Sequence, residues 1–391
     1  MRIDILKNII QSAHINFLFG SGLSKPYLST LGNIEKWLTE AEDIADAKVK
    51  DIVITSLYAK YFLEVMEPCL ETKAKADPDG YNKVLNQYEV FIRHWNTIIA
   101  QRNNGLIDKQ INVFSTNIDT FVEQAAENTG IEFNDGFKGH IKPVFREDGF
   151  TNVVTKVSPT FQNISLIPVF NYLKMHGSIN WKADNEQVSY DRTLSQIEEL
   201  VPLVNNLDDS QIIKVIEDTD TITSLETKAS TIKSTTGYSP NSDFISFREK
   251  YSHLIMINPR KAKFRETVLD LHFYELMRLF SNALEKNTSL LFVAGFSFAD
   301  EHIAKITIRA ANSNPTLQVI VFAYDSAAKD SVLKKLNNAG PQINNNILVL
   351  DPDGFIKVQD DDMKDEIKDL KHFDFESLNK YVFEKIKLLA K

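Results

Sequence analysis

Residues 15–24 of the chain are Ile-Asn-Phe-Leu-Phe-Gly-Ser-Gly-Leu-Ser. The first five of them are apolar apart from Asn16, and the apolar run stops at Gly20. This pattern predicts a mostly buried β-strand that ends in a turn. Because ligands bind at the carboxyl ends of the strands in an open α/β sheet, the turn marks the edge at which a site is expected.

The turn after this strand has the composition of a phosphate-binding turn. Gly20 and Gly22 would let the backbone approach a pyrophosphate, to which free N–H groups could donate. Ser21 and Ser24 could add hydroxyl donors. The turn is not the Gly-x-Gly-x-x-Gly fingerprint, because Lys25 stands at the third glycine, and it is not a Walker A loop. Glycine-rich turns after strands are common, so a purely structural role is an equal alternative.

A second strand end carries the sequence Ser-Thr-Asn-Ile-Asp. The short apolar stretch 111–114 predicts the strand, and a helix that ends at Gly130 follows it. Asn117 and Asp119 would lie at the turn between them, where Asn and Asp are ordinary helix caps. The functional alternative is that Asn117 faces a ribose, or the water that attacks it, and that Asp119 holds the loop or a ribose hydroxyl.

A third strand end is the stretch 167–175, which runs directly into His176 and Gly177. A lone histidine is more often structural than catalytic. A side chain beside a glycine at a strand end can nevertheless face a cleft, and an imidazole with an ordinary pKa of about 6.5 can accept a proton near neutrality. The nearest rival is His140, which we expect in a loop.

Two further turns could complete a pocket. Gly295 and Ser297 follow the predicted strand 290–293 and could contact phosphate or ribose, and Asn258-Pro259 could shape another wall. Ordinary turn chemistry is the stronger alternative for each. The sequence contains neither a His-Glu-x-x-His motif nor a Gly-x-Ser-x-Gly elbow, so we expect no metal site of the first kind and no nucleophile of the second.

Strands that alternate with helices predict an α/β fold with a Rossmann-like, mostly parallel sheet. We expect residues 1–391 to form a single domain. Helical spacing over about 33–103 predicts a helical insertion after the first strand, and about 184–250 a polar insertion. Within the latter, 217–243 is rich in Ser and Thr and is expected to be a mobile loop or part of an inserted subdomain. Asp300 is placed to cap the helix that follows it.

Composition limits the remaining choices. The 391 residues are 43% apolar and 25% charged, which is typical of a globular protein, and the net charge of −9 disfavours a nucleic-acid-binding surface. Cys69 is the only cysteine, which excludes an internal disulfide and a four-cysteine zinc site. Its expected role is that of a small, partly buried residue. The sequence shows no membrane-spanning run and no signal peptide, so a cytoplasmic location is expected.

The order of these motifs resembles that of the sirtuin family. Sirtuins carry Gly-Ala-Gly-x-Ser, Thr-Gln-Asn-Ile-Asp, His-Gly and a late Gly-x-Ser in this order, and the chain has a counterpart of each. The resemblance implies that NAD is the substrate, that Asn117 orients the water or the nicotinamide ribose, and that His176 is a general base. The cofactor-binding set that it implies is Gly20, Ser21, Gly22, Ser24, Thr116, Asp119, Gly295 and Ser297.

The chain departs from the family in three respects. Thr116 replaces the Gln and Ser115 the Thr of the second motif, the four-cysteine zinc module is missing, and a helical block replaces the usual shorter cofactor loop. These departures disfavour lysine deacylation. They resemble the bacterial sirtuin-like NAD hydrolases of anti-phage defence, and among these the partner of a HerA-type hexameric ATPase.

The expected activity is therefore NAD⁺ glycohydrolysis to nicotinamide and ADP-ribose, as a defence effector that depletes NAD in abortive infection. The alternatives are an NAD-dependent protein-lysine deacylase and a non-catalytic sensor of NAD or ADP-ribose. We expect no metal, a homo-oligomer, and a HerA-type ATPase as a candidate partner. No membrane is expected as a partner, and nucleic acid is expected only indirectly. Assembly could gate the enzyme by ordering the helical block over the pocket.

Overall fold

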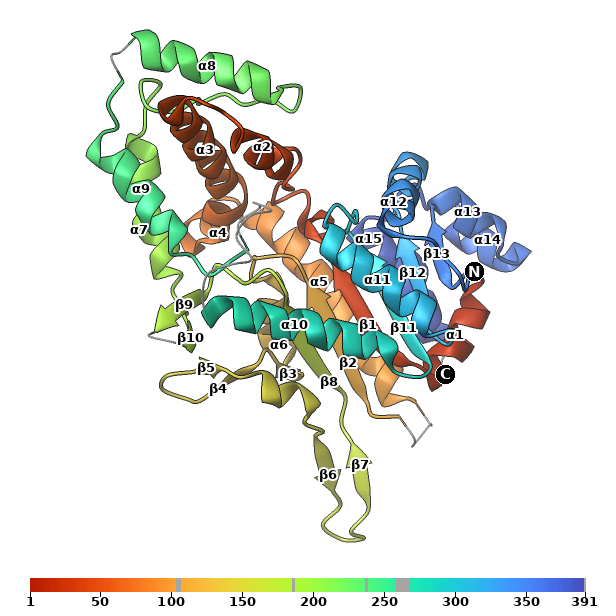
Figure 1. The fold of residues 1–391 in the computed structure, drawn as a ribbon. Helices are drawn as coiled ribbons and strands as arrows, with labels where there is room; N and C mark the ends of the chain where they lie inside the picture. Colours follow the sequence, from red (N-terminus) through yellow and green to blue (C-terminus); the bar gives the residue numbers. More distant parts are fainter. Residues whose placement is uncertain (103–106, 185–186, 236–237, 258–267, 390–391) are drawn as a thin grey trace.

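The computed structural model describes residues 1–102, 107–184, 187–235, 238–257 and 268–389 (Figure 1). Its centre is a seven-stranded sheet in which every neighbouring pair is parallel, in the order β13-β12-β11-β1-β2-β8-β3. The predicted α/β, Rossmann-like fold is thereby confirmed. The strands are β1 His14–Phe19, β2 Gln110–Ser115, β3 Glu132–Asn134, β8 Val169–Lys174, β11 Ser289–Ala294, β12 Gln318–Phe322 and β13 Ile347–Leu350.

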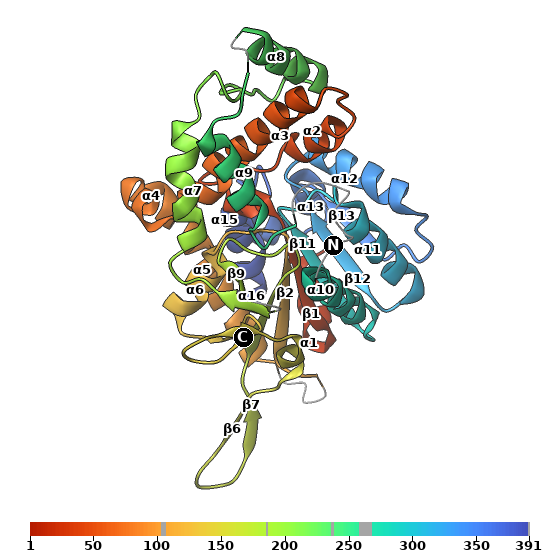
Figure 2. The ribbon, with the colours of Figure 1, turned by 60° about the vertical axis from the view of Figure 1, so that its left-hand side comes forward.

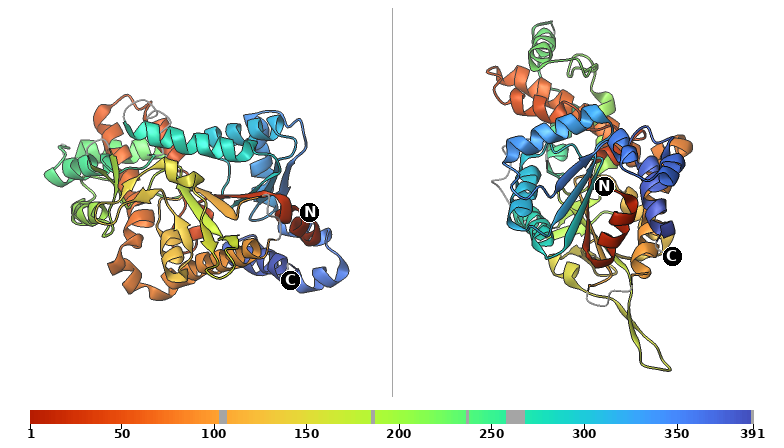
Figure 3. Two further views of the ribbon diagram at one scale, coloured as in Figure 1. Left: turned by 90° about the horizontal axis from the view of Figure 1, so that it is seen from below. Right: turned by 90° about the vertical axis from the view of Figure 1, so that its right-hand side faces the viewer.

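Helices cover both faces of this sheet, as a parallel sheet requires. Successive side chains of β1 point to opposite faces, so that Phe17 and Phe19 belong to one apolar cluster and Leu18 to the other. On the first face Phe17 packs edge-on against Phe91 of α5 at 4.9 Å between ring centres. The helices of this face are α1 Ile3–Ser12, α5 Pro78–Ala100, α6 Phe121–Thr129, α15 Phe375–Leu378 and α16 Glu384–Leu389, and those of the other are α10 Val268–Glu285, α11 Glu301–Ser313 and α12 Ser326–Ala339 (Figure 3).

A row of asparagines crosses the sheet from the edge strand β3 to its centre. The register places Asn134 of β3, Asn171 of β8 and Asn112 of β2 side by side, followed by Asn16 of β1. Each Nδ2 donates to the next Oδ1, at 3.0, 2.9 and 2.9 Å in this order. Asn16 Nδ2 then donates to Ser289 Oγ of β11 at 2.9 Å. Because buried amides need partners, this row fixes the register of five strands.

A second group of helices lies beyond the carboxyl edge of the sheet (Figure 2). It consists of α2 Ile34–Ala41, α3 Ala47–Tyr61 and α4 Glu71–Ala76, which follow β1, and of α7 Ser195–Asn206, α8 Ile222–Thr235 and α9 Ser242–Ser252, which precede α10. Of the two expectations for 217–243, that of a mobile loop is wrong, since α8 occupies most of the segment, and part of an insertion remains the alternative. Leu225 and Ala229 of α8 are fully buried, so their packing outweighs the weak helix propensity of its Ser and Thr residues.

Smaller elements complete the fold. Four short strands form an antiparallel sheet: β4 Phe137–Lys138, β5 Val144–Phe145, β9 Trp181–Asp184 and β10 Gln187–Tyr190. The hairpin of β6 Thr155–Val157 and β7 Ile164–Leu166 projects from the body (Figure 1). Helices α13 Pro352–Lys357 and α14 Asp361–Ile367 follow β13. His140 is exposed in the turn between β4 and β5, as expected. None of the helices in the described ranges combines the length and apolarity that a bilayer crossing needs.

Candidate functional site

A cavity of about 280 Å³ lies where β1, β2, β8 and β11 end. Most of its lining comes from the four strand-end turns, which meet because parallel strands end at the same edge. Nine of the ten residues that the sequence analysis assigned to a site line it: Ser21, Gly22, Ser24, Thr116, Asn117, Asp119, His176, Gly295 and Ser297. Gly20 lies behind this wall, and Asn258-Pro259 lies outside the described residues.

The glycines hold the turns after β1 and β11 in contact. Gly20 N donates to Ala294 O at 3.1 Å, and Gly22 N donates to Gly295 O at 3.0 Å. A Cβ atom built on Gly20 would lie 2.4 Å from Gly295 O, so a larger residue does not fit. These two amides are therefore not free for a phosphate, and the purely structural role that the sequence left open applies to them.

His176 is oriented by Asp300, a residue that the sequence analysis assigned only as a helix cap. His176 Nε2 lies 3.0 Å from Asp300 Oδ2, and the two side chains are 17% and 19% exposed. The cap is confirmed, since Asp300 Oδ1 accepts from His302 N at 2.8 Å. With its Nε2–H donated to the carboxylate, the imidazole keeps Nδ1 as an acceptor for a proton.

The surroundings of Asp300 keep its carboxyl group ionised. Burial by itself would raise the pKa of Asp300. The hydrogen bond and charge of His176, together with the amides at the start of α11, outweigh burial and hold the pKa of Asp300 below its ordinary value. An ionised carboxylate that fixes an imidazole is the arrangement by which a histidine is prepared to act as a base.

The turn that carries His176 is anchored from behind. Gly177 has φ +76°, and a Cβ atom there would lie 2.3 Å from Ile255 O. Ile257 N donates to His176 O at 2.8 Å, and Ser178 N donates to Ile255 O at 3.1 Å. The segment 254–257 thus fixes the backbone on both sides of the imidazole.

Asp119 belongs to a buried polar network beneath the cavity. Its Oδ2 accepts from Ser24 Oγ at 2.7 Å, and its Oδ1 accepts from Phe121 N at 3.2 Å. Lys174 Nζ donates to the backbone oxygen of Asp119 and, at 2.8 Å, to Glu123 Oε1. Since Ser24 and Asp119 bind each other, they join the turn after β1 to the turn after β2.

The carboxamide of Asn117 is buried and incompletely hydrogen-bonded. The side chain is 5% exposed, and Oδ1 has no hydrogen-bond partner among the described residues. A buried acceptor left in this state costs about 1–3 kcal/mol. Because Asn117 lines the same cavity as His176, a hydroxyl group of a ligand, or a bound water, would satisfy it.

The residues that form the outer wall of the cavity were not among the site residues predicted from the sequence. This wall is formed by the segment after Ser24 and by the helices that follow β1: residues 28–32, Glu35, Tyr61 and Val65. The only signal for it was the predicted helical block directly after the glycine turn. The residues between Ser24 and α2 carry no motif that places them over the turn.

The titration of Asp119 gives a test of its burial. Burial is the largest influence on its pKa and raises it, although Lys174 and the hydrogen bonds lower it. A raised pKa contributes stability that is present below the ordinary value of about 4 and is lost as the pH rises through the raised value. As the pH rises, the free energy of unfolding of the wild type should fall relative to that of Asp119→Asn. The expected fall is about 1.4 kcal/mol for each unit by which folding raises the pKa of Asp119.

Urea unfolding of both proteins between about pH 4 and pH 7 measures this difference. Asn338→Ala on the exposed surface of α12, which removes no ionisable group, serves as the control, and its difference from the wild type should not change with pH. An Asp119→Asn difference that is equally constant would contradict the raised pKa.

Comparison with known families agrees with the geometry. Residues 111–341, more than half of the chain, match the model of the SIR2-like domain. The chain belongs to the SIR2-like family. The SIR2-like match includes Asn117, His176 and Gly295, but it starts after the turn of Gly20–Ser24. SIR2-like domains use NAD, so NAD is the compound to consider in the cavity. No curated protein matches the chain.

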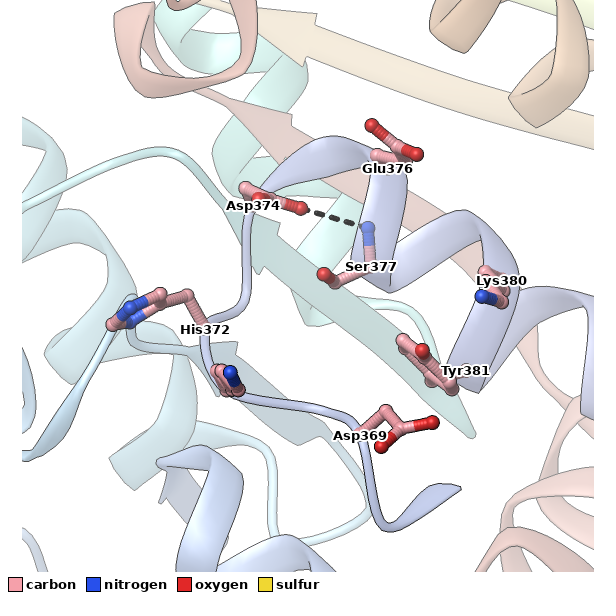
Figure 4. A pocket seen from close by; sticks show the side chains of 8 residues that line it. Asp369, His372, Asp374, Glu376, Ser377, Lys380 and Tyr381 are labelled. Atoms are coloured by element: carbon pink, nitrogen blue, oxygen red, sulfur yellow. Dashed lines mark hydrogen bonds between the residues drawn. The ribbon is translucent and has the colours of Figure 1, made fainter. Parts of the chain in front are cut away.

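Two other features do not form sites of this kind. The part of the chain that the structure describes has no group of three or more His, Cys, Asp or Glu side chains that could hold a metal ion. A shallow hollow of about 240 Å³ lies along the segment 369–381 (Figure 4). Its side chains are mostly exposed, and Asp374 is used as a cap for Ser377 N at 2.7 Å. None of its lining residues lines the cavity at the ends of β1, β2, β8 and β11, and we assign it no ligand.

Proposed function

We propose that this SIR2-like protein is an NAD⁺ glycohydrolase that releases nicotinamide and ADP-ribose. The observation that carries the proposal is the convergence of Asn117 and the His176–Asp300 pair on one cavity at the ends of the strands. Family membership supports NAD as the substrate. The cavity of about 280 Å³ lies just below the range for small-molecule sites, about 300–1,000 Å³.

The chemistry requires a base and an oriented water or ribose. The bond between nicotinamide and the ribose C1′ breaks, and the pair of electrons leaves with nicotinamide, which becomes neutral. Water then forms the new C–O bond at C1′, and its proton passes to His176 Nδ1 and on to solvent. Asn117 Oδ1, which has no protein partner in the described part of the chain, would accept from the water or from a ribose hydroxyl. Asp300 would stabilise the protonated imidazole.

The remaining polar groups of the wall suit the rest of the nucleotide. Ser21, Thr116 and Ser297 line the cavity from three different turns. The hydroxyl groups of Ser21 and Ser297 can donate to phosphate or ribose oxygens, whereas Thr116 Oγ1 donates to Phe19 O at 3.3 Å and can only accept. Ser24 does not belong to this group, because its hydroxyl donates to Asp119 and is 2.9 Å from the Tyr88 hydroxyl.

Incubation of the purified full chain with NAD⁺, with and without an acetyl-lysine peptide, tests the proposal. Chromatography should show equal amounts of nicotinamide and ADP-ribose, at a rate that the peptide does not change. Consumption of NAD⁺ only with the peptide would instead identify a deacylase. Binding of NAD⁺ without turnover, including in any assembled complex, would identify a sensor.

Asn117→Ala is expected to lower the rate of nicotinamide release about 100-fold, since one oriented hydrogen-bonding group is commonly worth this much in a transition state. The fold should survive, because Oδ1 makes no hydrogen bond within the described structure. Asn338→Ala on the exposed surface of α12 is the matched control and should be fully active. Equal rates for the two variants would exclude the role given to Asn117.

The proposed biological output is depletion of NAD in the cytoplasm as a defence against phage. A hydrolase of this kind must be gated, and α2 and α3 supply part of the cavity wall. A change of position in these helices would open or close access to His176. Self-association, or binding to a HerA-type hexameric ATPase, is the proposed gate. Mass measurement and NAD⁺ turnover of the chain alone and with such an ATPase test it, and a monomer that is fully active by itself would exclude it.

A further inference from the structure

A second cavity, of about 1,000 Å³, shares no lining residue with the cavity that Asn117 and His176 line. Its walls come from the start of α5, from α6, and from the turn between β10 and α7. We propose that this cavity binds a small organic cation with several N–H donors, of the class of protonated di- and polyamines. This inference does not depend on the proposed NAD⁺ hydrolysis, because binding can be measured without NAD.

Two buried acceptors in the wall have no hydrogen-bond partner among the described residues. They are Asn180 Oδ1 and Glu123 Oε2, and both residues line the cavity. Asn180 is 2% exposed, and the side chain of Glu123 is 9% exposed. Asn180 Nδ2 faces Glu123 Oε1 at 3.5 Å, which leaves the amide oxygen as the group to be satisfied. Both atoms accept hydrogen bonds, so the missing partner is a donor.

The charges of the wall favour a cation. Five carboxylates line the cavity, those of Glu71, Glu123, Glu127, Asp191 and Glu198. Two cationic side chains line it, those of Lys75 and Arg192. Lys75 Nζ is paired with Glu71 Oε1 at 2.5 Å. Glu127 and Glu198 are exposed at the rim. A hollow lined by an excess of one sign of charge concentrates ligands of the opposite sign.

The other side chains of the wall also suit an aliphatic cation. Tyr81 and Tyr190 both line the cavity, and the faces of tyrosine rings attract ammonium groups. Asp191 is not available as a partner, because its carboxylate accepts from Ser195 Oγ at 2.9 Å and from Thr193. Cys69 also lines the cavity, but burial raises the pKa of its thiol, so it offers no thiolate near neutrality.

The buried network of Asp119, Lys174 and Glu123 connects this second cavity with the cavity that Asn117 and His176 line. Glu123 Oε1 binds Lys174, and Lys174 binds the backbone oxygen of Asp119. A cation seated on Glu123 would compete with Lys174 for this carboxylate. Its effect would then reach the turn that carries Asn117, only two residues away from Asp119.

Calorimetric titration of the full chain with spermidine tests the inference, with butane-1,4-diol as the neutral probe. We expect spermidine to bind with a Kd below about 1 mM, and we expect added salt to weaken this binding. The diol should not bind. The double variant Glu127→Gln/Glu198→Gln at the rim should weaken binding about fivefold. Glu123→Gln should weaken it more than about tenfold, because it removes a desolvated charge.

On α14, Asp365→Asn removes one charge, as Glu123→Gln does, and Asp362→Asn/Asp365→Asn removes two, as the rim variant does. Each is the matched control for its counterpart, and we expect less than a twofold change for either. Should Glu123→Gln fail to fold, the rim variant still decides the question. No spermidine binding at about 10 mM, equal binding of the diol, or equal affinities for the rim variant and its control would each overturn the proposal.

Discussion

Replacement of His176 by alanine is expected to lower the rate of nicotinamide release from NAD⁺ about 10²- to 10⁴-fold, the range that general-base catalysis usually contributes. The imidazole lines the cavity that Asn117 also lines, and Asp300 holds its Nε2 at 3.0 Å. Alanine removes the proton acceptor but leaves the backbone contacts of the turn, which are made by His176 O and by Ser178 N. Single-turnover kinetics with the purified chain would measure the loss.

Two further variants separate catalysis from general damage. His140→Ala in the exposed turn between β4 and β5 should keep full activity. Asp300→Asn keeps an oxygen for the start of α11 but loses the negative charge beside the imidazole. Asp300→Asn should therefore lower the rate of nicotinamide release less than His176→Ala does. It should also shift the pH dependence of that rate. Full activity of His176→Ala, or an equal loss in His140→Ala, would show that the imidazole is not the base.

Replacement of Asn112 by leucine is expected to lower the free energy of unfolding by about 2–4 kcal/mol. Leucine has a similar size but would leave Asn16 Oδ1 without its donor, and Asn171 Nδ2 would keep only its second acceptor, Phe150 O. Asn16 and Asn171 are fully buried, so water cannot replace the lost partner. Thermal unfolding should show a midpoint lower by about 2–5 °C.

Asn338→Ala on α12 is again the matched control, and we expect it to change the midpoint by less than about 1 °C. An unchanged midpoint for Asn112→Leu would mean that the row of amides contributes nothing net to stability.

The positions of the strand ends could be predicted from sequence because each has a local signal. An apolar run that stops at a glycine or at Ser-Thr-Asn needs no tertiary information, and Gly20, Asn117 and His176 all stand directly at such ends. The cap by Asp300 and the end of α6 at Gly130, with φ +64°, were likewise local and are confirmed. The parallel order of strands followed from their alternation with helices.

What could not be predicted depends on pairs of residues that are distant in the chain. His176 and Asp300 are separated by 124 positions, and a helix cap has no feature that reveals a second partner for its other oxygen. The row of asparagines was hidden for the same reason. Asn16 was visible as a polar residue within an apolar run, but its pairing with Asn112 follows only from the register.

The place of β1 in the middle of the sheet has a consequence for synthesis on the ribosome. This strand emerges before the other six strands of the sheet, and Asn16 receives its acceptor Ser289 only 273 positions later. Until then the nascent chain can assemble only the half made of β1, β2, β8 and β3. One side of β1 meanwhile exposes a row of unsatisfied N–H and C=O groups, which is a template for association with other chains. A chaperone that shields this unfinished edge during translation would protect the protein at its most vulnerable stage.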